Sequence, residues 1–249
     1  MLYSSIQGPF RKDVGNVVAS AYGDVNGDKV PDYVYLTALK TPDSNFLQDI
    51  TLVIKDGRTG ITQNAKFPSN DGYVPSLFLG DFTGDRINDI LISIASGGSG
   101  GIMFHYIFSD VNNRLAMIFN YEDFNNKYEY KVDYLNNYRV SVENLYEKST
   151  YILDLTYKGK EYLSEIYTGE GILKAPIEGW VDPLSGLYPV DFDGDGVYEL
   201  LGYQKIAGRY HADSLGYVQS VLKWSGMRFE LSEQYVAVFG SEGRSVSEF

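Results

Sequence analysis

The stretch DVNGDKVPD at residues 24–32 recurs in pattern as DFTGDRIND at 81–89 and as DFDGDGVYE at 191–199. Each nine-residue stretch carries an oxygen-bearing side chain at positions 1, 3, 5 and 9 and Gly at position 4, and an apolar run follows directly. Gly permits a tight turn at position 4. Three copies with one spacing predict three loops of the same shape, each joining two strands. We call them the first, second and third acidic loops.

The oxygens of these loops are the ligands that Ca²⁺ prefers, because that ion takes six to eight oxygens in an irregular shell. An Asx-turn without metal would explain one such loop, but three copies favour a cation. We therefore expect up to three Ca²⁺ ions, each also bound by the position 7 carbonyl. The predicted ligands are Asp24, Asn26, Asp28, Val30 and Asp32; Asp81, Thr83, Asp85, Ile87 and Asp89; and Asp191, Asp193, Asp195, Val197 and Glu199.

Position 6 of the loop distinguishes the three predicted sites. It is Lys29 in the first loop and Arg86 in the second, where a positive side chain weakens binding of a cation. It is Gly196 in the third loop, which also carries four carboxylates. We expect the third loop to bind Ca²⁺ most tightly.

Composition indicates an all-β protein of substantial core. The chain has 249 residues, 44% of them hydrophobic, with 22 Tyr, 13 Phe and 26 Gly but only 8 Pro. Aromatic residues favour strands and Gly favours tight reversals. A helical pattern is almost absent.

The spacing of the loops predicts a repeat. They begin at residues 24, 81 and 191, so the second interval, 110 residues, is nearly twice the first, 57. A fourth repeat that has lost its loop ligands is therefore expected near residue 136. The predicted repeats span about 13–70, 71–125, 126–178 and 179–249.

Each repeat has room for about four strands, which predicts a single β-propeller domain of four blades with four antiparallel strands each; five or more irregular blades are the alternative. Residues 1–12 are expected to supply a strand that closes the ring. The predicted strands are 16–22, 33–39, 49–55 and 61–67; 76–79, 90–95, 102–109 and 115–121; 128–134, 138–144, 150–157 and 161–168; and 186–190, 198–204, 217–224 and 229–237.

The loops, with the residues that precede them, resemble the FG-GAP repeat, also called the VCBS repeat, of integrin α-chain propellers and bacterial surface proteins. The motif stands here as YGDVNGD at 22–28, LGDFTGD at 79–85 and PVDFDGD at 189–195. The resemblance implies a propeller whose loops bind Ca²⁺ between the first two strands of a blade. It also implies a binding or scaffold role, outside the cell or on its surface.

Charge and cysteine content limit the classes of partner and of chemistry that the chain can support. The net charge of −12 argues against a nucleic-acid binder, because neutralising phosphate needs a basic face. The chain has no Cys, which excludes disulfides and thiolate chemistry. No run of residues reaches transmembrane length, so membrane insertion is not expected. Calcium chemistry favours an extracellular or cell-surface location over the cytoplasm, with a leader absent from this sequence.

Candidate ligand contacts lie outside the acidic loops. Trp180, in a stretch at 169–185 expected to be irregular, and the nearby Tyr188 are candidate contacts for a sugar ring or a partner protein; the equal alternative is that Trp180 fills the joint between the third and fourth repeats. Residues Arg209, Tyr210, His211 and Asp213 place four functional groups in one predicted loop. His105 is expected to be a packed residue of an aromatic strand. No catalytic residue can be nominated, which favours a protein or carbohydrate ligand without catalysis; a polysaccharide-active hydrolase or lyase is the alternative.

Overall fold

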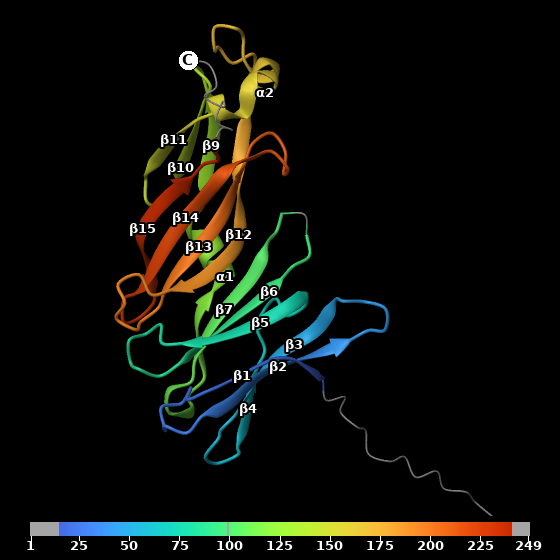
Figure 1. The fold of residues 1–249 in the computed structure, drawn as a ribbon, viewed down its shortest axis with the longest axis vertical. Helices are drawn as coiled ribbons and strands as arrows, with labels where there is room; N and C mark the ends of the chain where they lie inside the picture. The colour runs from blue at the N-terminus through green and yellow to red at the C-terminus, as the bar shows by residue number, and fades with distance from the viewer. Residues whose placement is uncertain (1–14, 99, 241–249) are drawn as a thin grey trace, which may run out of the picture.

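In the computed structural model, which describes residues 15–98 and 100–240, antiparallel sheets follow one another along the long axis of the molecule (Figure 1). The all-β prediction is confirmed. The expected closing strand at residues 1–12 lies outside the described residues.

The first two sheets are four-stranded meanders in sequence order. The first contains β1 (Asn16–Gly23), β2 (Asp32–Lys40), β3 (Leu47–Lys55) and β4 (Thr62–Ala65). The second contains β5 (Tyr73–Gly80), β6 (Asp89–Ala95), β7 (Met103–Ser109) and β8 (Ala116–Asn120). They fall within the first two predicted repeats.

The third sheet has seven strands, in the order β11-β10-β9-β12-β13-β14-β15. Its strands are β9 (Tyr130–Leu135), β10 (Arg139–Asn144), β11 (Thr150–Asp154), β12 (Glu178–Val190), β13 (Glu199–Ala207), β14 (Ser214–Trp224) and β15 (Phe229–Ala237). The sheet curls so far that its two edge strands are in contact: Tyr151 on β11 donates a hydrogen bond to the carbonyl of Gln234 on β15, at 3.2 Å. Its two edge strands therefore face each other.

The helical elements are short. They are α1 (Tyr121–Lys127), α2 (Gly159–Ile166) and the 3₁₀ turns Val111–Asn113 and Thr156–Lys158. The amide of Glu122 donates to the side chain of Asn120, which caps the start of α1. Helix α2 replaces the strand expected at 161–168. Within the described residues, neither helix has the length and apolar character needed to cross a membrane.

The four separate four-stranded sheets expected from the sequence do not form. Strands β9, β10 and β11 join the edge of β12, through the pairs Glu178 with Asp133 and Gly179 with Val132. Strand β12 is 13 residues long, and its other pairs are with β13. A strand of this length reaches both halves of the third sheet, so the residues of the third and fourth predicted repeats share one sheet. Neither four blades nor the alternative of five or more is shown.

Two hydrophobic cores hold these sheets. One buries residues of the first two sheets together with Leu184, Leu187, Leu200 and Leu222 of the third. The other fills the curled part of the third sheet, around Val132, Val140, Leu153 and Leu215 among others. The first core is continuous from the first sheet to the third, which joins the two halves of the chain. Whether they count as one domain, as the sequence predicts, stays a prediction.

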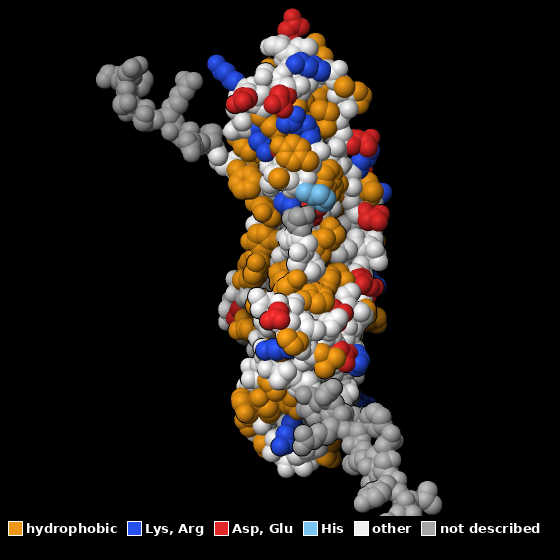
Figure 2. Space-filling view, turned by 90° about the vertical axis from the view of Figure 1, so that its right-hand side faces the viewer, with side chains coloured by type: hydrophobic (Ala, Val, Ile, Leu, Met, Phe, Trp, Pro, Cys, Tyr) orange, Lys and Arg blue, Asp and Glu red, His pale blue; other side chains and the backbone are white. Residues whose placement is uncertain are grey.

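Figure 2 shows one long face of the molecule, on which acidic and basic side chains are interspersed among hydrophobic ones. On this face the two signs of charge lie close together, so the negative net charge does not form a single acidic field there.

Candidate metal centre

The three acidic loops share one hydrogen-bond pattern. In each, the Asp at position 1 accepts the amides of positions 4 and 6, at 2.6–3.0 Å. The Asp at position 5 accepts the amide of position 7, at 2.8–2.9 Å. The carboxylate at position 9 accepts the amide of position 2, at 3.0–3.1 Å. The sequence repeat is therefore a repeat of conformation.

Positions 4 and 6 of every loop lie in the left-handed region of backbone space. Position 6 has a φ of 67° at Lys29, 66° at Arg86 and 89° at Gly196. That conformation favours glycine, so only the third loop meets it without a side-chain penalty.

The loops contact one another in a row, which Figure 1 shows along one edge of the molecule, at the turns β1–β2, β5–β6 and β12–β13. The position 8 amide of one loop donates to the position 1 carbonyl of the loop before it. Asn88 donates to Asp24 at 3.2 Å, and Tyr198 donates to Asp81 at 2.8 Å. Position 8 of the first loop is Pro31, which has no amide hydrogen to donate. The first loop therefore begins the row.

This row corrects the expected position of the fourth repeat. The third loop bonds directly to the second, although 110 residues separate them in sequence. Phe82 of the second loop lies against Tyr198 and Phe229 of the third sheet, with ring centroids 5.9 and 6.4 Å apart. The segment near residue 136 does not lie between the two loops; it is the turn between β9 and β10, in the part of the third sheet on the other side of β12.

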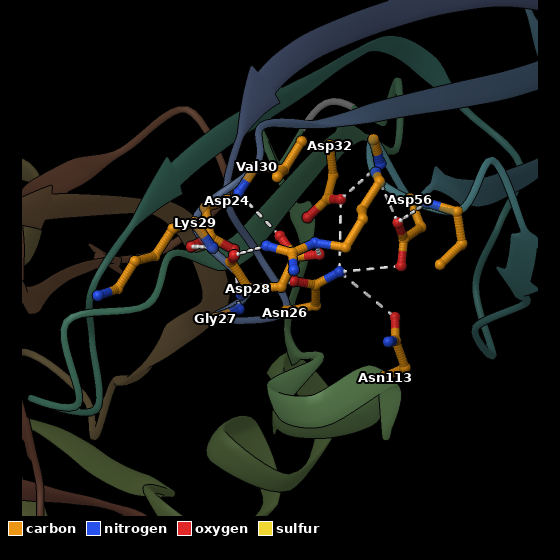
Figure 3. A network of polar contacts seen from close by, with 12 residues as sticks. Asp24, Asn26, Gly27, Asp28, Lys29, Val30, Asp32, Asp56 and Asn113 are labelled. Atoms are coloured by element: carbon orange, nitrogen blue, oxygen red, sulfur yellow. Dashed lines mark hydrogen bonds and ion pairs between the residues drawn. The ribbon is translucent and has the colours of Figure 1, made fainter.

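The first loop is bound to its surroundings through Asn26 (Figure 3). The Asn26 amide group donates to the carboxylates of Asp32 and Asp56, at 3.4 and 3.2 Å, and to the side chain of Asn113, at 3.5 Å. Asp32 is fully buried and also accepts the amides of Val25 and Gly57. Both carboxylate oxygens of Asp32 therefore accept hydrogen bonds from protein donors.

An arginine supplies positive charge to the first loop. Arg58, from the turn between β3 and β4, places its Nε 2.8 Å from the Asp28 carboxylate and donates from its Nη2 to the Asp28 carbonyl. A guanidinium fixed in this way offsets the charge that a metal ion would offset. In the first loop the Arg58 side chain therefore supplies the positive charge that a metal ion would supply.

The second loop is buried at positions 2 and 9, as the first loop is. Phe82 is fully buried and Asp89 is 1% exposed. Burial raises the pKa of Asp89 to about 6, and the negative charges of Asp85 and Asp81 add to that effect. The hydroxyl of Thr83, at position 3, has no hydrogen-bond partner among the described residues.

The third loop brings three carboxylates together. One oxygen each from Asp191, Asp193 and Asp195 lies within 4.8 Å of the others, a spacing that one cation can bridge. Of the described residues, only this group of acidic side chains converges so closely. Lys223 lies beside it, with its Nζ 2.9 Å from Glu199 and 3.7 Å from Asp193. Glu199 raises the pKa of Lys223, so this ammonium stays charged.

The predicted ligand contacts divide into separate groups. Trp180 lies in β12, not in an irregular stretch, and its ring centroid is 4.9 Å from that of His211. Both residues contact the buried Asp182: the Trp180 indole donates to it at 2.8 Å, and the His211 Nδ1 lies at 3.4 Å. Lys205 pairs with the same carboxylate at 2.9 Å. His211 itself is 60% exposed.

Asp213 and Arg209 are tied into the protein. Asp213 is 3% exposed and accepts hydrogen bonds from Lys158 and Tyr162, at 2.8 and 2.7 Å. The Arg209 side chain pairs with Glu165 at 2.7 Å and lies over the Tyr162 ring. Tyr210 is exposed. Tyr188 is separate from this group: it lies near the other end of β12 and packs on Tyr203.

Sequence reasoning missed the cations that face the loops. Arg58 comes from a turn and Lys223 from the end of β14, and neither belongs to a motif. Asp182, the centre of the Trp180 and His211 contacts, was missed too, because Pro183 next to it favours a loop assignment. The pairing of β12 with β13, in which Trp180 lies opposite Ala207, brings Trp180 and Asp182 close to His211.

Comparisons with known proteins place the chain in a family. A family model described as the YybI C-terminal domain matches residues 128–237. The chain is also 55% identical to "Uncharacterized protein YybI" of Bacillus subtilis (strain 168) over 235 residues, which are 94% of this chain and 90% of that protein. The chain belongs to the YybI family. The YybI C-terminal match coincides with the seven-stranded sheet, β9 to β15. No solved structure matches significantly.

The resemblance to FG-GAP or VCBS repeats is wrong, because the family that matches is YybI. The resemblance rested on three nine-residue loops and the few residues before them. Asp, Asn and Gly at this spacing form a stable hairpin loop through local hydrogen bonds, so the pattern is not specific to one family.

Proposed function

We propose that this YybI-family chain is a non-catalytic binding or scaffold module in which the third acidic loop binds one Ca²⁺ ion. The ion would fix the β12–β13 hairpin and the contacts that this loop makes with the second loop. The partner would be a protein or a carbohydrate, and the site of action the cell exterior or surface. Free Ca²⁺ reaches the millimolar range there, which suits a site with few protein ligands.

The observation that carries the proposal is the convergence of Asp191, Asp193 and Asp195. Loop amides donate to each of the three carboxylates and leave lone pairs for a cation. Asp193 and Asp195 are exposed, so an ion can enter from solvent. A Cβ at Gly194 or Gly196 would meet nothing within 4 Å, which leaves space around the turn.

The contacts of Asp213 and Arg209 support a non-catalytic role. Each is paired with a side chain of the protein itself, so neither offers a free acid or base. The polysaccharide-active alternative would depend on Trp180 and His211, whose rings meet edge to face. That alternative stays a prediction.

We expect Ca²⁺ at 5 mM to raise the melting temperature by about 3 °C, because a ligand that binds only the folded state stabilises it by mass action. Mg²⁺ at equal concentration should do less, since it demands a stricter octahedral shell. Differential scanning calorimetry after EDTA treatment measures both.

The same substitution at position 5 of each loop locates the ion. Asp195→Asn should abolish the calcium shift, whereas the matched controls Asp28→Asn and Asp85→Asn should retain most of it. If Asp28→Asn or Asp85→Asn removes the shift and Asp195→Asn does not, the third loop is the wrong site. If Ca²⁺ does not change the melting temperature of the wild type, the metal proposal is wrong.

We expect Lys223→Met to tighten Ca²⁺ binding by about three- to tenfold, because it removes a positive charge near the site and frees Glu199. Isothermal titration calorimetry measures the change. Lys66→Met is the matched control, since Lys66 pairs with Asp49 in the first sheet. Unchanged affinity in Lys223→Met would place the ion away from Glu199.

A further inference from the structure

A cavity of about 390 Å³ lies where the second and third sheets meet. Its lining comes from β8 and α1 and, in the third sheet, from the β10–β11 turn and from the ends of β14 and β15 at their connecting turn. Helix α1 links β8 to β9, so the cavity lies beside the connection between the two sheets (Figure 1). Small-molecule sites often have this volume and lie between packed units of a fold.

Aromatic rings line the cavity and touch one another in sequence. Tyr146 packs on Tyr128 with ring centroids 5.8 Å apart, and Tyr128 packs on Phe124 at 4.9 Å. Phe119 continues the row, 6.3 Å from Phe124 and 5.8 Å from Phe229. Tyr146 is 55% exposed, so the row is open to solvent at that end. The rings form one continuous apolar surface against which another aromatic ring can pack.

Lys127 places a positive charge at the exposed end of this surface. Its Nζ lies 4.7 Å from the ring centroid of Tyr146 and 5.0 Å from that of Tyr128. The side chain lines the cavity and is only partly buried, so a ligand can reach it. No carboxylate in the described part of the chain forms an ion pair with it. The ammonium is therefore available to an anion in the cavity.

The other two charged residues of the lining limit the charge of the ligand. Arg228 directs its Nε and Nη2 to Glu230, both at 2.8 Å, so its charge is already offset. Asp123 lies one turn before Lys127 on α1 and would repel a second negative charge. One unpaired ammonium with a carboxylate nearby favours a singly charged anion over a phosphate or a dicarboxylate.

Cationic and neutral ligands match the cavity less well. The Lys127 ammonium repels a cation, and it already lies over the two tyrosine rings that would attract one. A neutral ligand that covers the ammonium removes water from it without supplying a partner. A carboxylate supplies that partner, so charge complementarity selects an anion.

We propose that this cavity binds a small aromatic monocarboxylate, whose ring packs on the aromatic row and whose carboxylate pairs with Lys127 Nζ. The site is separate from the acidic loops and uses no Ca²⁺. It goes beyond the scaffold role, because it gives the junction of the second and third sheets a small ligand of its own.

Isothermal titration calorimetry of the full chain in EDTA tests the charge of the ligand. The probes are phenylpropionate, phenylpropanol and phenylpropylamine, which share one apolar body and at pH 7 are an anion, a neutral molecule and a cation. We expect phenylpropionate to bind saturably, phenylpropanol about fivefold more weakly, and phenylpropylamine more weakly still.

Tryptophan fluorescence locates the bound probe. The chain has two Trp residues, and the Trp224 ring packs on that of Phe229, with centroids 5.2 Å apart. In Trp180→Phe, Trp224 is the remaining reporter, and its emission should change with the midpoint seen by calorimetry. Tyr146→Ala, which removes an exposed ring of the lining, should weaken both phenylpropionate and phenylpropanol. Unchanged binding in Tyr146→Ala, or an unchanged Trp224 emission, would place the probe elsewhere and overturn the proposal.

Substitution of the lysine assigns the charged contact. Lys127→Met should reduce the affinity for phenylpropionate to that for phenylpropanol. The matched control Lys131→Met should keep the preference, since Lys131 pairs with Asp133 and does not line the cavity. A lack of saturable phenylpropionate binding, equal binding of the three probes, or a preference retained in Lys127→Met would each contradict the proposal. The wild-type titrations decide it even if a variant does not fold.

Discussion

Asp213→Ala should lower the free energy of unfolding by about 3–5 kcal/mol, because it removes the acceptor from a buried charged group. Asp213 is 3% exposed. Its carboxylate accepts from Lys158 Nζ at 2.8 Å, from the Tyr162 hydroxyl at 2.7 Å and from the Arg209 amide at 3.0 Å. The Lys158 side chain is only 17% exposed, so water cannot fully replace the lost partner.

Urea unfolding at pH 7 measures this loss. Asp213→Asn, which keeps the shape but removes the charge, should fall between the wild type and Asp213→Ala. Glu165→Gln is the matched control: Glu165 pairs with Arg209 at the surface, is 57% exposed, and should change stability by at most about 1 kcal/mol. A loss below about 1 kcal/mol in Asp213→Ala would mean that Lys158 finds another partner.

The same carboxylate gives a defined pH dependence. Burial raises the pKa of Asp213, but hydrogen bonds from Lys158, Arg209 and Tyr162 outweigh burial and hold the pKa below its usual value of 3.8. The ionised form is thus favoured by folding. Its contribution is present above about pH 4 and is lost as the pH falls through the lowered pKa. Asp213→Ala should therefore lose less stability than the wild type on acidification below pH 4.

These contacts show where sequence reasoning about the candidate residues failed. Arg209, His211 and Asp213 are close in sequence, and their functional groups suggested one site. In the structure the buried Asp213 carboxylate contacts Lys158, whereas the exposed His211 packs against Trp180. The direction of each side chain depends on partners more than 20 residues away in sequence, which spacing cannot reveal.

The strands were predictable where the hydrophobic period and the turn residues indicated the same strand boundaries. The acidic loops and the strands that flank them were predicted because Gly, Asp and Asn form local turns whose hydrogen bonds do not depend on distant residues. Helix α2 was not, since its residues can follow either period and tertiary contacts decide between them: Ile166 is buried, and Tyr162 bonds to Asp213.

Strand β12 was only half predicted for a related reason. Pro183 and Gly179 favour a loop, and only the part after residue 185 was expected as a strand. The pairing of β12 with β13 has register shifts between Val181 and Leu184 and between Leu184 and Gly186. Proline is tolerated at such irregular positions because its missing amide breaks no regular ladder bond. This one extended strand merges the third and fourth predicted repeats into a single sheet.

The positive side chains that face the acidic loops could not be predicted either, and the reason is physical. A loop sequence shows which oxygens are present but not which positive group faces them. Arg58 and Lys223 reach the first and third loops from turns and strands that pair only in the folded state. Whether such a loop takes a metal ion or an internal cation is therefore decided by the fold.

Asp110→Asn should raise the free energy of unfolding at pH 7.5 by about 2–3 kcal/mol, measured by urea unfolding in EDTA. Asp110 is 1% exposed. One of its oxygens accepts from Gln63, and the other has no partner within the described part of the chain. Burial raises the pKa of Asp110 to about 6, and the nearby negative charges of Asp32 and Asp56 add to the effect. An amide of the same shape carries no charge and can still accept from Gln63.

The pH dependence of this gain distinguishes relief of charge from better packing. Because the pKa is higher in the folded state than its ordinary value of 3.8, the folded form holds the proton more tightly. Wild-type stability from this group is therefore greatest below about pH 4 and is lost as the pH rises to about 6. The gain from Asp110→Asn should be near zero at pH 4 and complete at pH 7.5. Asp154→Asn, at a carboxylate whose pKa is lowered by hydrogen bonds from Thr156, should give no gain at either pH. An equal gain for Asp110→Asn at both pH values would show that its charge is not the cause, because only an ionised carboxylate bears the cost of burial beside Asp32 and Asp56.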